Sequence, residues 1–211
     1  MGRKYTLNLK NIKNDSHEKY YWLGFLAGDG SVSKTESRIR VELKDTDVEQ
    51  LENLKAFFET NTPLLERTNN LGCHSFIASI NSKELKNYLA QYNIVPAKTN
   101  TFTIPESKIP LIYIYDFVRG LIDADGCIHI RKNRNNIPSL SFVSKVKTCA
   151  EQVNRILNFN NSISIENNAY SIHKEGKEVI SILDKLYENS TEKSRLKRKY
   201  EIYQTLKDEN L

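Results

Sequence analysis

Two acidic residues, each followed by glycine, are the first candidates for chemistry in this sequence. Asp29 precedes Gly30 and Asp125 precedes Gly126, and each acid closes an apolar run. A carboxylate in the last turn of a helix opposes the partial negative charge there by roughly 0.3–1 kcal/mol. Two such carboxylates ~4 Å apart would also repel by about 4 kcal/mol at an effective dielectric constant near 20. Such a pair needs a cation, and its oxygen ligands suit Mg²⁺.

Small residues in both runs indicate how the two acids would meet. Gly24 and Gly28 are four residues apart in the first run, and Gly120 and Ala124 are four apart in the second. Residues at this spacing share one face of a helix. Because faces of small side chains let two backbones approach closely, we expect the two helices to pack against each other. That packing would bring the two acids together at one end.

These two runs resemble the signature of the LAGLIDADG homing endonucleases. The residues at 120–126, Gly-Leu-Ile-Asp-Ala-Asp-Gly, reproduce it almost letter for letter, and the run at 22–30 reads as a second copy. The first copy departs from the pattern because Ala27 stands where the second copy has Asp123. The resemblance extends over roughly residues 16–200 and is of the single-chain, two-motif type.

The resemblance implies a set of metal ligands. The last acid of each motif, Asp29 or Asp125, binds the metal in the family, and the preceding residues, Gly28 and Ala124, belong to the same metal site. Family members use Mg²⁺ or Mn²⁺ and hydrolyse both DNA strands across the minor groove. Two-metal sites stabilise both the attacking and the leaving oxygen of a phosphoryl displacement. The departure at the first motif affects neither ligand acid.

A lysine at the end of a strand completes the predicted catalytic set. The resemblance implies that Lys44 lies near the cleaved phosphate, where it could position water or stabilise developing charge; an ordinary solvated lysine is the alternative. Aligning the two halves by their helix-capping patterns sets Lys44 opposite Val146. A slip of one residue decides between Lys145 and Lys147, and we take Lys145 as the counterpart.

The remaining sequence predicts the same order of elements twice. Alternating apolar residues predict half-buried strands, capping boxes predict helix starts, and Gly30 is expected in a left-handed conformation after the first motif helix. In the first half these signals fall at 15–18 (helix start), 31–35 and 38–44 (strands), 46–49 (helix start), 64–68 and 74–80 (strands) and Ser82 (helix start). In the second half they fall at 127–131 and 140–143 (strands), 148–151 (helix start), 162–166 and 170–173 (strands) and 178–187 (helix).

The repeated order predicts an α+β fold of two pseudo-symmetric αββαββα halves. Each half would hold a four-stranded antiparallel sheet, and the resemblance implies that the sheets form a saddle over DNA. We expect an N-terminal half at 1–95, a linker at 96–109 that contains Pro96 and Pro105, and a C-terminal half at 110–211. The last half ends in a basic helix that has no equally long counterpart.

The polar strand faces are the predicted DNA contacts. Arg, Asn and Ser are residue types that read base edges in the major groove. A strand of ~10 residues spans ~33 Å, or about 10 base pairs, so two unlike halves predict an asymmetric site of about 20 base pairs. The candidates are Ser33, Thr35, Arg38 and Arg40 in the first half and His129, Arg131, Asn133, Arg134, Asn135, Ser139 and Ser141 in the second. Lys193, Arg195, Lys197, Arg198 and Lys199 form a basic run, which is either a flanking phosphate contact or a solvated helix face.

Composition adds mainly exclusions. The 211 residues carry a net charge of +5, which by itself does not identify a nucleic-acid partner. The three cysteines have no CxxC spacing and the four histidines are scattered, so neither a zinc site nor a disulfide framework is indicated. No apolar run reaches the ~20 residues of a membrane span, and the start does not resemble a signal peptide. We expect a cytoplasmic or organellar-matrix protein that does not bind membranes.

The leading hypothesis is a monomeric, metal-dependent, site-specific endonuclease that cleaves double-stranded DNA. A maturase, which would bind intron RNA as a splicing cofactor on the same scaffold, is the alternative. A DNA-binding regulator without catalysis is disfavoured, because such a protein is expected to have lost a motif acid and both are present.

Overall fold

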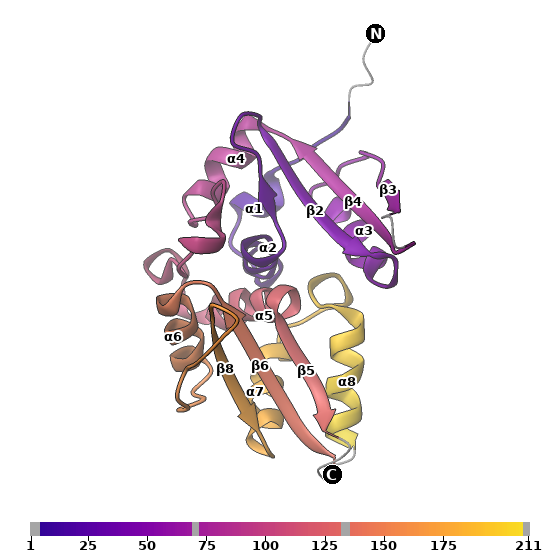
Figure 1. The fold of residues 1–211 in the computed structure, drawn as a ribbon. Helices are drawn as coiled ribbons and strands as arrows, with labels where there is room; N and C mark the ends of the chain where they lie inside the picture. The colour runs from indigo at the N-terminus through magenta and orange to yellow at the C-terminus, as the bar shows by residue number, and fades with distance from the viewer. Residues whose placement is uncertain (1–4, 69–71, 132–135, 209–211) are drawn as a thin grey trace.

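The computed structural model describes residues 5–68, 72–131 and 136–208. The chain folds into two halves that meet where α2 (His17–Gly28) packs against α5 (Ile114–Asp125) (Figure 1). The other first-half elements are α1 (Lys10–Lys13), β1 (Ser31–Val32), β2 (Arg38–Lys44), α3 (Val48–Phe57), β3 (Leu65–Thr68), β4 (His74–Asn81) and α4 (Lys83–Ala90). The other second-half elements are β5 (Gly126–Arg131), β6 (Ile137–Ser144), α6 (Lys147–Ile156), β7 (Ser164–Glu166), β8 (Ala169–Glu175), α7 (Glu178–Tyr187) and α8 (Lys197–Asp208).

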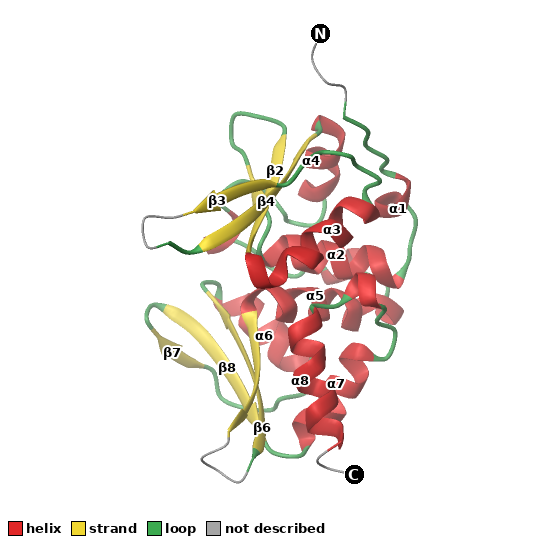
Figure 2. Cartoon of the chain, turned by 90° about the vertical axis from the view of Figure 1, so that its right-hand side faces the viewer, coloured by secondary structure: helices red, strands yellow, loops and turns green. Residues whose placement is uncertain are grey.

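The two sheets have the same topology, which confirms the predicted α+β fold of two αββαββα halves. Their strand orders are β1-β2-β4-β3 and β5-β6-β8-β7, and all neighbouring strands are antiparallel. Both sheets lie on one side of the molecule and the helices on the other (Figure 2). Between the halves, residues 91–113 contain only short 3-10 turns. In the part of the chain described above, no helix is both long and apolar enough to span a membrane.

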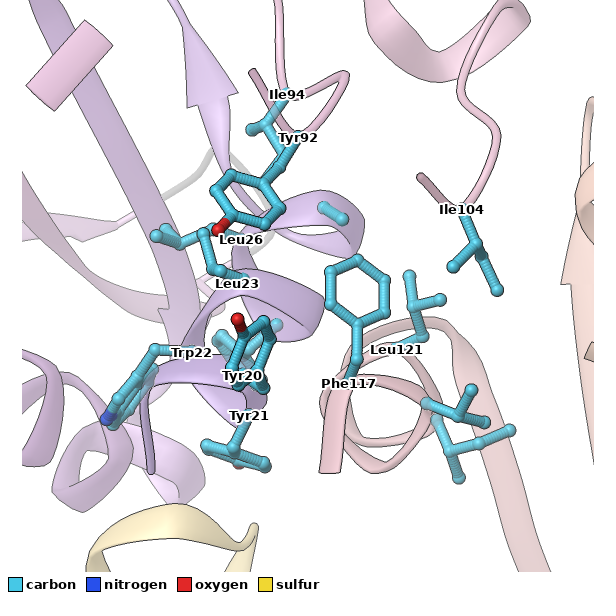
Figure 3. Close-up of a cluster of buried hydrophobic side chains, with 14 of the residues drawn as sticks. Tyr20, Tyr21, Trp22, Leu23, Leu26, Tyr92, Ile94, Ile104, Phe117 and Leu121 are labelled. Atoms are coloured by element: carbon cyan, nitrogen blue, oxygen red, sulfur yellow. The ribbon is translucent and has the colours of Figure 1, made fainter. Parts of the chain in front are cut away.

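The motif helices contact each other through their backbones, as the spacing of small residues predicts. A Cβ atom added to Gly24 would lie 1.9 Å from the carbonyl oxygen of Phe117, and one added to Gly120 would lie 2.1 Å from that of Tyr21. No side chain fits at either position without moving a helix. Around this contact, aromatic and aliphatic residues of α2 and α5 form a buried cluster that also includes Ile104 (Figure 3).

Four local predictions about helix ends were wrong. α3 begins at Val48 without a side-chain cap, so the predicted capping box at 46–49 does not form. Ser16, rather than Asp15, caps α2, and its side chain accepts from the backbone N–H of Lys19. α6 begins at Lys147, before the predicted capping box at 148–151. Gly30 is not left-handed; instead, a Cβ there would lie 2.3 Å from the carbonyl oxygen of Leu26, so a close backbone approach requires the glycine.

Candidate active site

The two motif acids lie where the C-terminal ends of α2 and α5 meet. Asp29 caps the end of α2 and Asp125 is the last residue of α5. A Cβ on Gly28, next to Asp29, would lie 3.0 Å from a carboxylate oxygen of Asp125 and 2.3 Å from the Cβ of Ala124. Asp29 is partly buried, whereas the side chain of Asp125 is exposed. The small residues therefore bring the two acids to one place.

The electrostatics of this place favour a cation. Burial, together with the negative charges of Asp125 and Asp47, raises the pKa of Asp29 to about 6, although Lys199 and Lys98 oppose the shift. Desolvation also raises the pKa of Asp125, again against the two lysines. Raised pKa values mean that the ionised pair lacks compensating positive charge. Two carboxylates in this state fit a divalent cation with oxygen ligands.

Protein groups alone do not complete a metal site here. Within the described ranges, no group of three or more His, Cys, Asp or Glu side chains could hold a metal. The carbonyl oxygen of Gly28, one of the predicted metal-site residues, accepts a hydrogen bond from Lys98. A divalent ion at Asp29 and Asp125 would therefore need further oxygen ligands from outside the protein.

A buried lysine caps the first motif helix, and the sequence analysis missed it. Lys98 is 7% exposed, and its Nζ donates to the carbonyl oxygens of Gly28 (2.9 Å) and Gly30 (2.6 Å). A cation stabilises the negative end of a helix. Burial lowers the pKa of Lys98, while the charges of Asp125 and Asp29 oppose that shift. Lys98 thus holds the turn that carries the first acid.

Lys199 does the same for the second motif helix. Its Nζ donates to the carbonyl oxygens of Ile122 (2.6 Å), Asp123 (2.8 Å) and Gly126 (2.6 Å), and the residue is 2% exposed. The prediction that Lys199 belongs to an exposed basic run was therefore wrong. Each buried lysine follows the last helix of its αββαββα unit, so comparing the two repeats could have revealed the pair.

The strand register shows that Lys44 and Lys145 occupy equivalent positions in the two halves. Ser31, two positions after Asp29, pairs with Arg40 in the first sheet, and Cys127, two positions after Asp125, pairs with Ser141 in the second. Arg40 and Ser141 are therefore equivalent, and so are the residues four positions further on, Lys44 and Lys145. The capping-box alignment missed this because the loop between strand and helix is longer in the first half.

The surroundings of Lys145 place it beside one of the acids. It lines a hollow of about 190 Å³ together with Asp125 and Lys98. Its Nζ donates to the carbonyl oxygens of Asn167 and Asn168, both at 3.1 Å. Lys147 instead forms an ion pair with Glu151 on the exposed side of α6.

The first sheet presents the predicted basic residues on its outer face. Arg38, Arg40 and Lys44 alternate with buried residues of β2, and Arg40 and Lys44 are exposed. Arg38 forms an ion pair with Glu36. The predicted contacts Ser33 and Thr35 lie in the connection between β1 and β2, where the hydroxyl group of Ser33 accepts from a backbone N–H. The register adds further residues to this face that the sequence analysis did not name: Arg67, Ser75 and Ser79.

The second sheet has a different outer face, because its basic residue is held by other side chains. Arg131 Nε lies 2.6 Å from Glu175 Oε1, and Arg131 Nη2 lies 3.2 Å from His173 Nε2. Ser139 is 0% exposed beneath this cluster, so the prediction that it contacts DNA was wrong. His129 and Ser141 are partly exposed. The predicted contacts Asn133, Arg134 and Asn135 lie outside the described residues.

The basic run near the C-terminus joins the two halves. Arg198 Nε donates to both carboxylate oxygens of Asp47, and Lys197 Nζ lies 3.6 Å from Glu49. The guanidinium group of Arg195 stacks over the ring of Tyr200. Lys193 remains exposed. Lys199 is the buried member of the run, whereas the side chains of Lys193, Lys197 and Arg198 are exposed, so a phosphate contact and a solvated face both stay open for them.

Asp123, where the first motif has Ala27, also links the halves. Its carboxylate accepts from the hydroxyl group of Tyr21 (3.0 Å) and from the backbone N–H of Leu196 (2.8 Å), and Tyr21 accepts in turn from Gln50. The departure between the two motifs thus has a structural reason.

Comparisons with known proteins agree with this geometry. Residues 113–202 match the family described as the LAGLIDADG-like domain. A Methanocaldococcus jannaschii protein, uncharacterized protein MJ0314, is 26% identical over 180 residues, which cover 78% of this chain and 63% of that protein. The chain thus spans less than two-thirds of the length of this relative.

Three solved structures share the fold at low sequence identity. The homing endonuclease I-WcaI bound to its DNA recognition sequence has a TM-score of 0.60 at 18% identity, covering 85% of this chain and 81% of that chain. I-SmaMI, bound to an uncleaved DNA target in the presence of calcium ions, has a TM-score of 0.53 at 12% identity, covering 93% of each chain. The N-terminal LAGLIDADG domain of DUF199/WhiA has a TM-score of 0.52 at 16% identity, covering 85% of this chain and 86% of that chain.

These matches, with two motif helices meeting at paired acids, agree with the resemblance seen in the sequence. Residues 113–202 match the LAGLIDADG-like domain, and the whole chain, with one motif helix in each half, shares the fold of the solved structures above.

Proposed function

We propose that this protein is a homing endonuclease that hydrolyses one phosphodiester on each strand of a specific double-stranded DNA site. The observation that carries the proposal is the meeting of Asp29 and Asp125 at the ends of α2 and α5, just before the first strand of each sheet. I-WcaI, which shares the fold, is bound to its DNA recognition sequence, and this supports DNA as the ligand.

The metal site would be built on the two acids. Asp29 and Asp125, with the carbonyl groups of Gly28 and Ala124 beside them, would hold Mg²⁺ or Mn²⁺, and phosphate oxygens of DNA would complete the ligand set. A bound divalent ion would stabilise negative charge on the attacking and leaving oxygens. The two carboxylates would hold the ion between the halves, where one phosphate from each strand could approach.

The lysines divide into two kinds by their exposure. Lys98 and Lys199 are buried; they hold the helix ends and offset part of the charge of the acids. Lys44 and Lys145 are exposed at strand ends, where each could contact the scissile phosphate or orient the attacking water. Because the two lysines are equivalent in register, each would act on one strand of the duplex.

The outer faces of the sheets would read the DNA sequence. Exposed Arg40 and Lys44 in the first half, and partly exposed His129 and Ser141 in the second, are the proposed contacts. Since the two faces differ in chemistry, the proposed target is asymmetric, with about 20 base pairs. Both halves lie in one chain, so the proposed active form is a monomer with halves at 1–95 and 110–211, and we place it in the cytoplasm or an organellar matrix.

Cleavage of a randomised library tests the proposal. The purified protein is incubated with Mg²⁺ and randomised duplexes, and the cut ends are sequenced. We expect enrichment of one long asymmetric site, and loss of cutting in the double variant Asp29→Asn, Asp125→Asn. A protein that cuts no duplex but binds folded intron RNA would instead be the maturase alternative.

A further inference from the structure

Four lysines are related by the pseudo-two-fold symmetry of the two halves. Lys98 and Lys145 line one hollow with Asp125. Lys199 and Lys44 are their counterparts, by helix capping and by strand register respectively. Each cleavage position would therefore have one buried and one exposed lysine, and these residues alone would treat the two DNA strands alike.

Arg198 and Asp47 break that symmetry. Three residues separate Lys44 from the helix that follows, whereas one residue separates Lys145 from its helix, and Asp47 lies in the longer loop. The residue before the buried lysine of the first half is Ala97, so Arg198 has no basic counterpart either. Both members of the pair therefore lie on the Lys44 side alone.

Asp47 holds Arg198 through the Nε atom of its guanidinium group. Arg198 Nε donates to the two carboxylate oxygens of Asp47 at 2.9 and 3.0 Å. The side chain of Asp47 is 10% exposed, whereas that of Arg198 is 52% exposed. Among the residues that the structure describes, the terminal amino groups of Arg198 have no hydrogen-bond partner. The guanidinium group is thus held at Nε, while about half of the side chain stays exposed to solvent.

The position of the pair matches the charge of a nucleic-acid backbone. Lys199, the next residue, bonds the turn after Asp125, and the charge of Asp47 reaches Asp29. A planar guanidinium group matches the geometry of phosphate oxygens, with parallel N–H donors. A fixed arginine beside the acids would thus meet the phosphate that approaches from its side.

We infer that Arg198 binds a backbone phosphate at one of the two cleavage positions only, and that Asp47 is the positioning residue that holds it. The inference rests on the proposed function and deepens it. Its consequence is that the two strands are cut at unequal rates, so that a nicked duplex accumulates before the double-strand break.

Binding without metal tests the phosphate contact. The duplex recovered from the library is titrated in EDTA at several salt concentrations, with wild type, Arg198→Gln and Arg155→Gln. We expect Arg198→Gln to lower the slope of log K against log salt by about 0.9, the value for one phosphate. Arg155 is a matched control, because it is exposed and paired with Glu106, and its variant should keep the wild-type slope. An unchanged slope in Arg198→Gln would overturn the inference.

Cleavage with each strand labelled separately tests the asymmetry. Arg198→Gln should slow one strand about 10- to 100-fold more than the other, and Asp47→Asn should slow the same strand less. Because the pair also joins the two halves, Tm is measured for both variants; a loss of stability alone would slow both strands equally and overturn the inference. A wild-type protein that cuts neither strand refutes the proposed function, and the inference with it.

Discussion

The two halves share a backbone plan but differ in how their side chains are used. On the first sheet, Arg40 points outward with no ion pair among the described residues. On the second sheet, Arg131 is held by Glu175 and His173, which reduces its freedom to contact a ligand. The common plan thus fixes where the strands and acids lie, whereas side-chain chemistry on each half is independent. Under the proposed function, this independence predicts an asymmetric DNA site.

The motif helices show the same contrast within the core. Ala27 packs in the first helix, while the equivalent Asp123 in the second connects Tyr21 and Leu196. Asp123 in the second half therefore joins the C-terminal segment to Tyr21 of the first half, and Ala27 makes no equivalent connection.

Replacing Asp123 should have the largest effect. Asp123→Ala leaves the Tyr21 hydroxyl group and the Leu196 N–H without their acceptor in the core, and should lower the free energy of unfolding by about 4 kcal/mol. Urea denaturation measures it. Asp123→Asn, which keeps an acceptor, should cost less. If Ala27→Asp leaves the free energy of unfolding unchanged, the contrast between the two motif helices fails.

Replacing each of the two buried lysines should lower the free energy of unfolding in proportion to the number of hydrogen bonds lost. Lys199→Met removes donors from three carbonyl groups and Lys98→Met from two, so we expect losses of about 3 and about 2 kcal/mol respectively. The two denaturation curves provide the measurement. Equal losses would show that burial of the lysine, rather than the bond count, sets the cost.

Stability should depend on pH through the acids. The pKa of Asp29 is about 6 in the folded protein against an ordinary 3.8, so the folded state holds a proton that the unfolded chain loses between those values. This contribution is fully present below pH 4 and is lost as pH rises through 6, on the order of 3 kcal/mol. The difference in Tm between Asp29→Asn and wild type should grow over this range without metal. Added Mg²⁺ should raise the wild-type Tm most at pH 7, and a flat difference would contradict the assignment.

The sheet faces should show the smallest effect. Arg40→Ala should weaken DNA binding by about 1 kcal/mol and leave stability unchanged, because its side chain is exposed. Arg131→Ala should instead lower stability by up to about 1 kcal/mol, since it breaks the contact with Glu175. Fluorescence anisotropy and thermal denaturation separate the two outcomes. If both variants change DNA affinity and stability by the same amounts, the two sheet faces do not differ in the way described.

The sequence predicted the fold because its signals were local and repeated. Glycine spacing predicted the helix contact, and strand alternation predicted the sheets. Lys98 and Lys199 escaped prediction because their role depends on carbonyl groups about seventy residues earlier, and a lysine in a polar stretch looks solvated. Ser139 was misplaced since alternation gives the face of a strand, not what covers that face. The left-handed prediction for Gly30 failed because crowding by the preceding turn, not handedness, selects glycine there.

The seam at Gly24 and Gly120 has a mechanical consequence. Because backbone touches backbone there, no flexible side chain can absorb a change in the angle between the halves. Under the proposed function the protein acts as a stiff template, so the deformation energy of docking falls on the duplex. Base steps that bend or unstack easily at the middle of the target should then be favoured even where no side chain reaches them.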